Sequence, residues 1–323
     1  MLEQLMRFFR SPKEKVKNFK PLRHSFFKDK GLADILFSEG YAVVDFLSDK
    51  ERSQLEQLFQ NNHDFSDRNG VSFFSLFSSD LHYRCRIDDS IRNILSPTFE
   101  KWFVSYQNVV NMYIVKTPGQ AGKVAIHQDA SMIDEFKYSS INVWIPLQTV
   151  DMEDGPLCII PRSHHISVPY RGSTIPPIAK NIESHLYPYF IPIKVKLGQA
   201  IFFDARMFHY SPPNFSTKNR IVVLSRINPL KAATISFFKP KEDFNSKIEM
   251  WRCPEDYFMK YNGFEDNRRP EGGSLLGYVN QPSLLNIEEF EKKRIALGIE
   301  IKNQLNEEGG EKQNFVREPI GIR

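Results

Sequence analysis

Three residues of the chain could bind one metal ion if a β-structure brought them together. His127 and Asp129 flank Gln128, and His209 follows eighty residues after Asp129. Side chains two apart on a β-strand project from the same face, so His127 and Asp129 can converge while Gln128 faces away. A second imidazole from a neighbouring strand would complete two nitrogens and one carboxylate oxygen, with the other side of the metal open. That donor set is the facial triad of non-haem Fe(II) oxygenases.

The triplet alone does not establish a metal site. Histidine-x-aspartate occurs often by chance, and a histidine in an apolar strand is more often a hydrogen-bonded core residue than a ligand. The adjacent His164 and His165 are a poorer candidate, because neighbouring side chains on an extended strand point to opposite faces and could not bind one ion. The motifs around the triplet therefore decide the interpretation.

Three motifs follow the triplet in order. They are Val143-Trp144-Ile145-Pro146-Leu147, then Asp154-Gly155-Pro156-Leu157-Cys158-Ile159-Ile160-Pro161-Arg162-Ser163-His164, then Gly198-Gln199-Ala200-Ile201-Phe202-Phe203-Asp204. This run, which leads into His209, resembles the phytanoyl-CoA dioxygenase family of Fe(II)/2-oxoglutarate oxygenases over roughly residues 30 to 230. The resemblance implies that His127, Asp129 and His209 bind Fe(II), with 2-oxoglutarate as cosubstrate and O2 as oxidant. The family usually has glycine where Arg162 stands, which affects the local turn and not the metal site.

The far carboxylate of 2-oxoglutarate needs a planar, permanently charged partner, which describes arginine better than lysine. Arg220 lies eleven residues beyond His209, and the resemblance makes it the anchor, with Ser211 as its hydroxyl companion. Arg226, on the same strand face, is the competing anchor. An arginine on a strand is otherwise most often part of a surface ion pair that contributes little. The resemblance also places Trp144 beside the cosubstrate.

A further group of residues is expected at the cosubstrate. Asn111, Tyr113 and Val115 share one face of their strand, and we expect this face to look into the barrel, with Asn111 and Tyr113 binding the cosubstrate. Packing in the core or at a sheet edge is the alternative.

These residues need a β-rich scaffold. Short segments rich in Val, Ile and Phe, separated by Pro, Gly, Asn and Asp, predict strands without regular intervening helices. The predicted strands cover residues 40–46, 109–116, 123–127, 141–148, 157–160, 191–196, 200–203 and 220–227. This pattern argues against a parallel α/β sheet and for a mainly β fold with flanking helices, whose core is a double-stranded β-helix, the cupin-like jelly roll.

Helices are expected before the barrel. Ser48 and Glu51 form a capping box at the start of one, and two shorter helices are expected over residues 90–95 and 99–104. The connection over residues 165–190 is longer than an ordinary loop, so it is either a lid or binding loop or a passive excursion.

Composition bounds the remaining possibilities. The chain has 323 residues, of which 41% are hydrophobic and 27 are phenylalanine, which is ample for a packed core. Three cysteines favour a reducing compartment. No apolar run approaches the roughly 20 residues that span a bilayer, and no secretory signal is recognisable. We therefore predict a soluble, cytoplasmic protein without a transmembrane segment.

The net charge of +4 is unevenly distributed. Residues 1–30 carry nine Lys or Arg and three acids, which gives +6 and leaves −2 for the rest of the chain. Nucleic-acid binding is therefore not indicated. The first ten residues could form an amphipathic helix that contacts acidic lipid or a partner; the alternative is a solvated arm.

Three regions are predicted: a basic arm over residues 1–30, the oxygenase jelly roll with its N-terminal helices over 31–230, and an aromatic-rich extension over 231–323. No strand is predicted after Ile227. The rings of the extension are expected to pack on the outside of the barrel, with a cavity wall or a subunit interface as alternatives. A helix of about twenty residues is expected from Asn286 to just before Gly309, packed on the core or on a second copy in an oligomer.

The leading prediction is an Fe(II)/2-oxoglutarate-dependent dioxygenase that hydroxylates an aliphatic carbon of a small molecule and releases succinate and CO2, with a role in biosynthesis. The family takes acyl thioesters, amino acids and natural-product intermediates, some of them carrier-bound, and the fold does not choose among them. Two alternatives stay open. One is a non-catalytic cupin-like binding protein; the other is a jelly-roll metalloenzyme that does not use 2-oxoglutarate.

Overall fold

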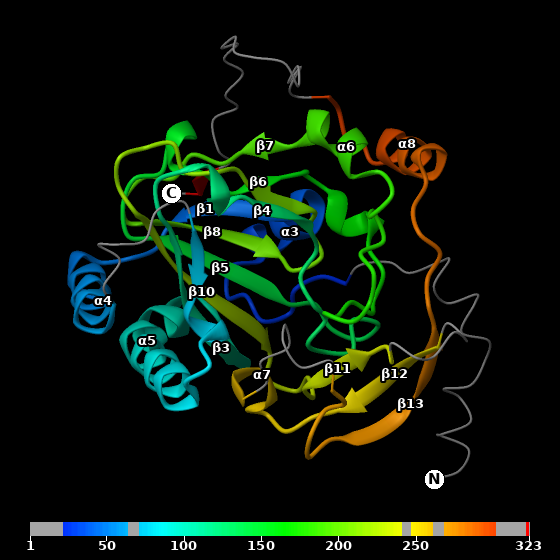
Figure 1. Cartoon of the computed structure of the whole chain (residues 1–323), viewed down its shortest axis with the longest axis horizontal. Coiled ribbons are helices and arrows are strands. Elements are labelled where there is room, and N and C mark those ends of the chain that lie inside the picture. The colour runs from blue at the N-terminus through cyan, green and yellow to red at the C-terminus, as the bar shows by residue number, and fades with distance from the viewer. Residues whose placement is uncertain (1–21, 64–70, 241–246, 261–267, 302–320, 323) are drawn as a thin grey trace.

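The computed structural model describes residues 22–63, 71–240, 247–260, 268–301 and 321–322. Its core is a pair of facing β-sheets (Figure 1). The larger sheet has seven strands in the order β14-β1-β8-β5-β10-β3-β2. They are β1 (Tyr41–Asp45), β2 (Ser72–Phe74), β3 (Tyr106–Lys116), β5 (Ile141–Pro146), β8 (Gln199–Asp204), β10 (Arg220–Pro229) and β14 (Gly321–Ile322). All pairs are antiparallel except β1 with β14.

The smaller sheet carries the metal-site histidines. Its four strands run in the order β4-β9-β6-β7 and are β4 (Val124–His127), β6 (Cys158–Ile159), β7 (Ile191–Pro192) and β9 (His209–Ser211). The predicted mainly β, jelly-roll fold is confirmed, since antiparallel sheets dominate and helices flank them.

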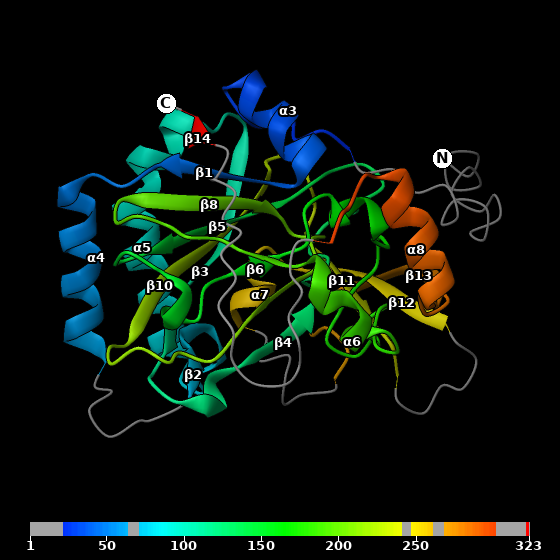
Figure 2. The same ribbon diagram turned by 90° about the horizontal axis from the view of Figure 1, so that it is seen from above.

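Helices cover the outer face of the larger sheet (Figure 2). They are α3 (Lys30–Glu39), α4 (Asp49–Asn62) and α5 (Leu81–Trp102). Leu55, Ile91 and Leu95 are fully buried and share one core cluster with Phe202 of β8. The capping box of Ser48 and Glu51 starts α4 as predicted.

The expectation of two short helices at 90–95 and 99–104 is wrong, because α5 runs unbroken through Pro97. Proline lacks the N–H that would bond the carbonyl of Asn93. The hydroxyl of Ser96 donates to that carbonyl instead, at 3.4 Å, so the helix continues.

The remaining helices are short. They are η2 (Ser75–Phe77), η3 (Gln120–Gly122), η4 (Met152–Asp154), η5 (Ser163–Ile166), α6 (Glu183–Leu186), η6 (Tyr187–Tyr189), α7 (Tyr257–Lys260) and α8 (Ile287–Ala296). Among the described residues, no helix has the length and apolar character needed to cross a membrane.

The C-terminal extension differs from expectation in two respects. It forms a third sheet in the order β11-β12-β13, with β11 (Ile235–Phe238), β12 (Lys247–Arg252) and β13 (Ser274–Asn280), where no strand was predicted. The helix that begins at Asn286 ends at Ala296 and not after about twenty residues, because Gly298 adopts the left-handed backbone region, with φ 64°. The helix is docked on the chain itself, since Phe290 is fully buried against Tyr189. The predicted amphipathic helix over residues 1–10 and the segment before Gly309 lie outside the described residues.

Candidate metal centre

The fold brings His127, Asp129 and His209 together. Strands β4 and β9 pair antiparallel with His127 directly opposite His209. Asp129 follows two residues after β4 ends, and its backbone N–H donates to the carbonyl of Ala205 at 3.1 Å. Its Oδ1 lies 3.7 Å from Nε2 of His127 and 3.8 Å from Nε2 of His209. One ligand atom from each residue lies within 4.8 Å of the other two, close enough to share an ion.

The two imidazoles are turned so that Nε2 faces the centre. Nδ1 of His127 lies 2.8 Å from the carbonyl of Ala125, and Nδ1 of His209 lies 3.1 Å from the carbonyl of Met207. A carbonyl accepts only, so each Nδ1 carries a proton and Nε2 is the nitrogen left for a metal ion. Burial, followed by the nearby His127, lowers the pKa of His209 to about 4, which keeps this imidazole neutral near pH 7.

The two oxygens of Asp129 have different neighbours. Oδ2 accepts from the amide of Asn142 and lies 3.1 Å from Nη2 of Arg226, which leaves Oδ1 toward the imidazoles. Burial alone would raise the pKa of Asp129, but His209, Arg226 and His127 together lower it to about 2. The carboxylate is therefore ionised, as a metal ligand must be. Arg226, the competing candidate for the anchor of the cosubstrate carboxylate, is paired with Asp129.

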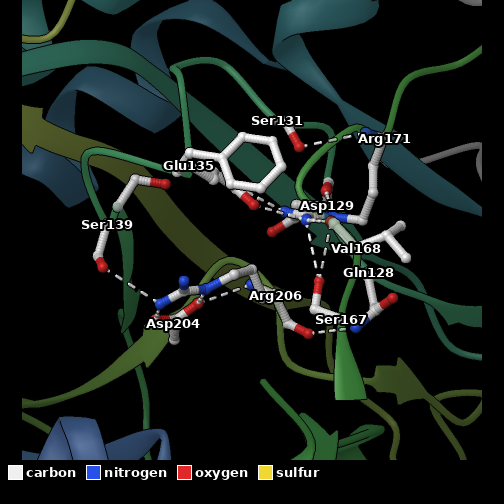
Figure 3. Close-up of polar contacts among 12 residues, drawn as sticks. Gln128, Asp129, Ser131, Glu135, Ser139, Ser167, Val168, Arg171, Asp204 and Arg206 are labelled. Atoms are coloured by element: carbon white, nitrogen blue, oxygen red, sulfur yellow. Dashed lines mark hydrogen bonds and ion pairs between the residues drawn. The ribbon is translucent and has the colours of Figure 1, made fainter. Parts of the chain in front are cut away.

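A buried ion pair braces the loop that carries Asp129 (Figure 3). The Arg171 guanidinium donates to the Asp129 carbonyl at 2.7 Å and to both oxygens of Glu135 at 2.7 and 2.8 Å. It also donates to Ser167 and to the Val168 carbonyl. The side chains of Arg171 and Glu135 are 8% and 1% exposed. Sequence reasoning missed both residues, because a contact between two loops leaves no periodic signal.

The same loop is held on its other side. The amide of Gln128 donates to the carbonyl of Arg206, whose guanidinium forms a buried pair with Asp204 and donates to Ser139 at 3.2 Å (Figure 3). Gln128 thus points away from the metal site, as its position between the two ligands predicted. The 165–190 connection contributes Arg171, so it is not a passive excursion.

A second group of polar residues lies where the cosubstrate anchor was predicted. Arg220, which is 2% exposed, donates to the hydroxyl of Ser211 at 3.0 Å and to the carbonyl of Gly155. Its guanidinium carbon lies 5.4 Å from the centre of the Trp144 ring, a stacking contact typical of arginine. Burial lowers the pKa of Arg220 to about 10. Sequence reasoning missed Lys116, whose ammonium donates to Ser211 Oγ at 2.6 Å and is fully buried.

The expectation for Asn111 and Tyr113 is wrong. Asn111 bonds Asp88 of α5 through both its backbone and side-chain N–H groups, and the Tyr113 hydroxyl donates to the Leu55 carbonyl of α4 at 2.7 Å. This face of β3, with Val115, therefore packs under the helices. The opposite face, with Val110, Met112 and Ile114, lines the cavity. His164 and His165 both direct Nε2 to the Phe37 carbonyl and take no part in the site.

A cavity of about 630 Å³ joins the two ends of the site. The three candidate metal ligands line it, as do Trp144, Ser211, Arg220 and Arg226. Phe237, Phe238 and Phe258 of the C-terminal extension line it as well. These three rings therefore form part of the cavity wall, which was one alternative to the favoured packing on the outside of the barrel.

The chain is similar to one described family. The model of the phytanoyl-CoA dioxygenase family, PhyH, matches residues 35–222. A phytanoyl-CoA dioxygenase of Arabidopsis thaliana is 32% identical over 113 residues, which are 34% of this chain and 40% of that protein. Phytanoyl-CoA dioxygenase domain-containing protein 1 of Danio rerio is 32% identical over 120 residues, covering 35% and 41%. The aligned part is thus well under two thirds of either relative's length.

Solved structures resemble the chain more distantly. The carbocyclase SnoK from nogalamycin biosynthesis, described as non-haem and α-ketoglutarate-dependent, is 16% identical, with 68% of this chain and 87% of that one covered and a TM-score of 0.43. EctD from S. alaskensis with 2-oxoglutarate and 5-hydroxyectoine is 17% identical, with 64% and 78% covered and a TM-score of 0.44. Likenesses of this degree do not indicate a function.

Proposed function

Because the chain belongs to the phytanoyl-CoA dioxygenase family, we propose that it is an Fe(II)/2-oxoglutarate-dependent dioxygenase that hydroxylates an aliphatic carbon of a small molecule. The observation that carries the proposal is one cavity with two complementary ends. A two-histidine, one-carboxylate cluster lines one end, and the buried guanidinium of Arg220 lines the other.

The donor set at the first end fits Fe(II). His127 and His209 present their Nε2 nitrogens and Asp129 presents one ionised oxygen, a combination suited to this ion with positions left for other ligands. Asn142 and Arg226 hold the second oxygen of the carboxylate. Such outer partners orient metal ligands and raise affinity.

The other end fits a carboxylate. Arg220 has no carboxylate within ion-pair distance among the described residues, and its Nε has no hydrogen-bond partner there. Lys116 adds a buried amino group that donates to the same Ser211 hydroxyl, but burial lowers its pKa to about 6, so Arg220 is the group that stays charged near pH 7. Burying a cation without a counter-charge is costly, and a bound dicarboxylate would supply the counter-charge that Arg220 lacks in the protein alone.

When bound, iron, 2-oxoglutarate and O2 supply the oxidation: one oxygen atom enters a C–H bond and the other enters succinate, with release of CO2. The protein's part is orientation and exclusion of water. Arg220, with Ser211, would hold the far carboxylate, and Trp144 would flank it. Arg171 holds the loop that presents Asp129.

The test is a binding spectrum. Anaerobic protein mixed with Fe(II) and 2-oxoglutarate should develop a weak visible charge-transfer band. His127→Ala should abolish the band, whereas His82→Ala, a control at an exposed position on α5, should leave it intact. Folded wild-type protein without a band would refute the proposal.

Succinate release then separates the alternatives. A cupin-like binding protein would bind ligands without forming succinate from any substrate. A jelly-roll metalloenzyme that does not use 2-oxoglutarate would keep its turnover in Arg220→Ala, whereas loss of the anchor should cripple an oxygenase.

A further inference from the structure

Part of the cavity lining is apolar and has no part in the chemistry at the metal or at Arg220. We define the apolar wall as Phe74, Phe77, Met132, Leu224 and Phe258. All five side chains line the cavity and pack against the barrel's interior core, yet each remains partly exposed. The rings of Phe74 and Phe77 lie 5.3 Å apart. Apolar surface left open inside a concave site indicates an apolar ligand.

The apolar wall is held in place by a buried arginine. Arg84 of α5, 5% exposed, donates through Nη1 to the carbonyl of Ser78, directly after Phe77, at 2.5 Å. Through Nε and Nη2 it donates to the carbonyls of Met259 and Lys260, directly after Phe258, at 3.0 and 2.8 Å. One guanidinium thus joins the two segments that carry these phenylalanines. The apolar wall is therefore built into the protein before any ligand binds.

The charges near the metal are already compensated. Arg226 is paired with Asp129, and Arg171 is paired with Glu135. A charged substrate group in this part of the cavity would lose its water without gaining a free partner among the described lining residues.

Two further charged side chains line the cavity. Lys123 is exposed and donates to the hydroxyl of Tyr187 at 2.8 Å, and Glu183, at the first turn of α6, is half-buried. Because Lys123 is positive and Glu183 is negative, the two side chains together do not form a binding site for a phosphate group or for any other strong anion.

We propose, building on the oxygenase function above, that the substrate presents an uncharged, lipophilic body to the apolar wall, and that Phe77 and Phe258 select for it. A volume of about 630 Å³ lies in the range that encloses a drug-sized molecule. The proposal disfavours a free amino acid and a phosphate-bearing carrier as the part of the substrate that enters. Phe258 lies beyond residues 35–222, whereas Phe77 lies within them, so the family match does not cover the contribution of Phe258 to this selectivity.

A matched pair of fluorescent probes tests the proposal. N-phenyl-1-naphthylamine is neutral, and 8-anilinonaphthalene-1-sulfonate is the same ring system with one negative charge. In Arg220→Gln, where the sulfonate has no unpaired guanidinium to pair with in the cavity, titration should give one site for the neutral probe, with affinity about tenfold or more above that for the sulfonate. Phe258→Ser and Phe77→Ser should each weaken binding of the neutral probe by about tenfold, the order expected for losing one buried ring.

Controls separate the cavity from the surface and from the fold. Phe215→Ser changes a ring that is 59% exposed and does not line the cavity, so binding should not change. Phe77→Leu keeps an apolar side chain and should retain most of the affinity even if Phe77→Ser loses stability. Equal affinity of Arg220→Gln for both probes, or unchanged binding in folded Phe258→Ser and Phe77→Ser, would overturn the proposal.

The outcome is independent of the oxygenase test. Probe binding requires neither iron nor 2-oxoglutarate. A chain that prefers the neutral probe but gives no charge-transfer band would contradict the oxygenase function alone. A chain that gives the band, but whose Arg220→Gln variant prefers the sulfonate, would contradict only the substrate class.

Discussion

Replacing Arg171 by methionine should weaken both the fold and metal binding, for separable reasons. The change removes the partner of Glu135, whose side chain is 1% exposed. Breaking a buried ion pair by deleting one partner typically costs about 3–5 kcal/mol, because the remaining charge is buried and uncompensated. It also removes the hydrogen bond that holds the Asp129 carbonyl. Loss of such an outer contact typically lowers metal affinity about 10- to 100-fold.

The double variant Arg171→Met with Glu135→Leu isolates the second effect. Replacing both partners removes the unpaired charge, so most of the unfolding free energy should return. Metal affinity should stay low, because the Asp129 carbonyl still lacks its donor. Urea unfolding would measure the free energy, and anaerobic calorimetry with Fe(II) would measure affinity. Arg171→Lys should recover little, since an ammonium cannot reach these acceptors in the same planar arrangement.

Two results would refute this reasoning. If Arg171→Met lowers the unfolding free energy by less than about 1 kcal/mol, the buried pair contributes no more to stability than an exposed ion pair does. Full recovery of metal affinity in the double variant would mean that Arg171 acts only through the charge of Glu135 and does not position Asp129.

Three further predictions concern the cosubstrate end. Arg220→Ala should weaken 2-oxoglutarate binding about 100-fold, by loss of a buried charged partner, while the Fe(II) affinity measured by calorimetry stays unchanged. If the variant and the wild type bind 2-oxoglutarate with the same affinity, Arg220 is not the anchor. Burial, followed by the neighbouring Arg220, lowers the pKa of Lys116 to about 6 from 10.5. Between these values the unfolded chain binds more protons, so wild-type stability should rise with pH by at most about 1.4 kcal/mol per unit. Urea midpoints of Lys116→Met at pH 7 and 9 should differ less than those of wild type, and an equal difference would contradict the assignment. Gly155→Ala should displace the segment that carries Ser211, because a Cβ there would lie 2.7 Å from the carbonyl oxygen of Pro212 and φ is +67°. The affinity for 2-oxoglutarate, measured by calorimetry, should fall while the affinity for Fe(II) stays the same. An unchanged affinity for 2-oxoglutarate would show that the segment can move to accommodate the Cβ without disturbing the anchor.

The sequence predicted what depends on local spacing and chain order. The separation of His127 from Asp129 and the motif run toward His209 located the cluster. The face of β3 could not be predicted, because residues on both sides of this strand are buried and alternation then gives no direction. Asn111 and Tyr113 were assigned to the cavity because they share one strand face that was expected to look into the barrel, yet their partners are Asp88 and a carbonyl of α4. Nothing in the sequence indicates which distant carbonyl or carboxylate will satisfy a polar side chain.

The distribution of counter-charges assigns the two ends of the cavity to different ligands. At the metal end each arginine already has a carboxylate, since Arg226 is paired with Asp129 and Arg171 with Glu135. At the other end, Arg220 has none among the described residues. A dianion entering this cavity therefore gains most by placing one carboxylate at Arg220, and its second chelating end must then face His127 and His209. Once that position is filled, the apolar wall is the main surface left for a second molecule. Since the cosubstrate offsets buried charge and the lipophile does not, we expect 2-oxoglutarate to bind before the substrate.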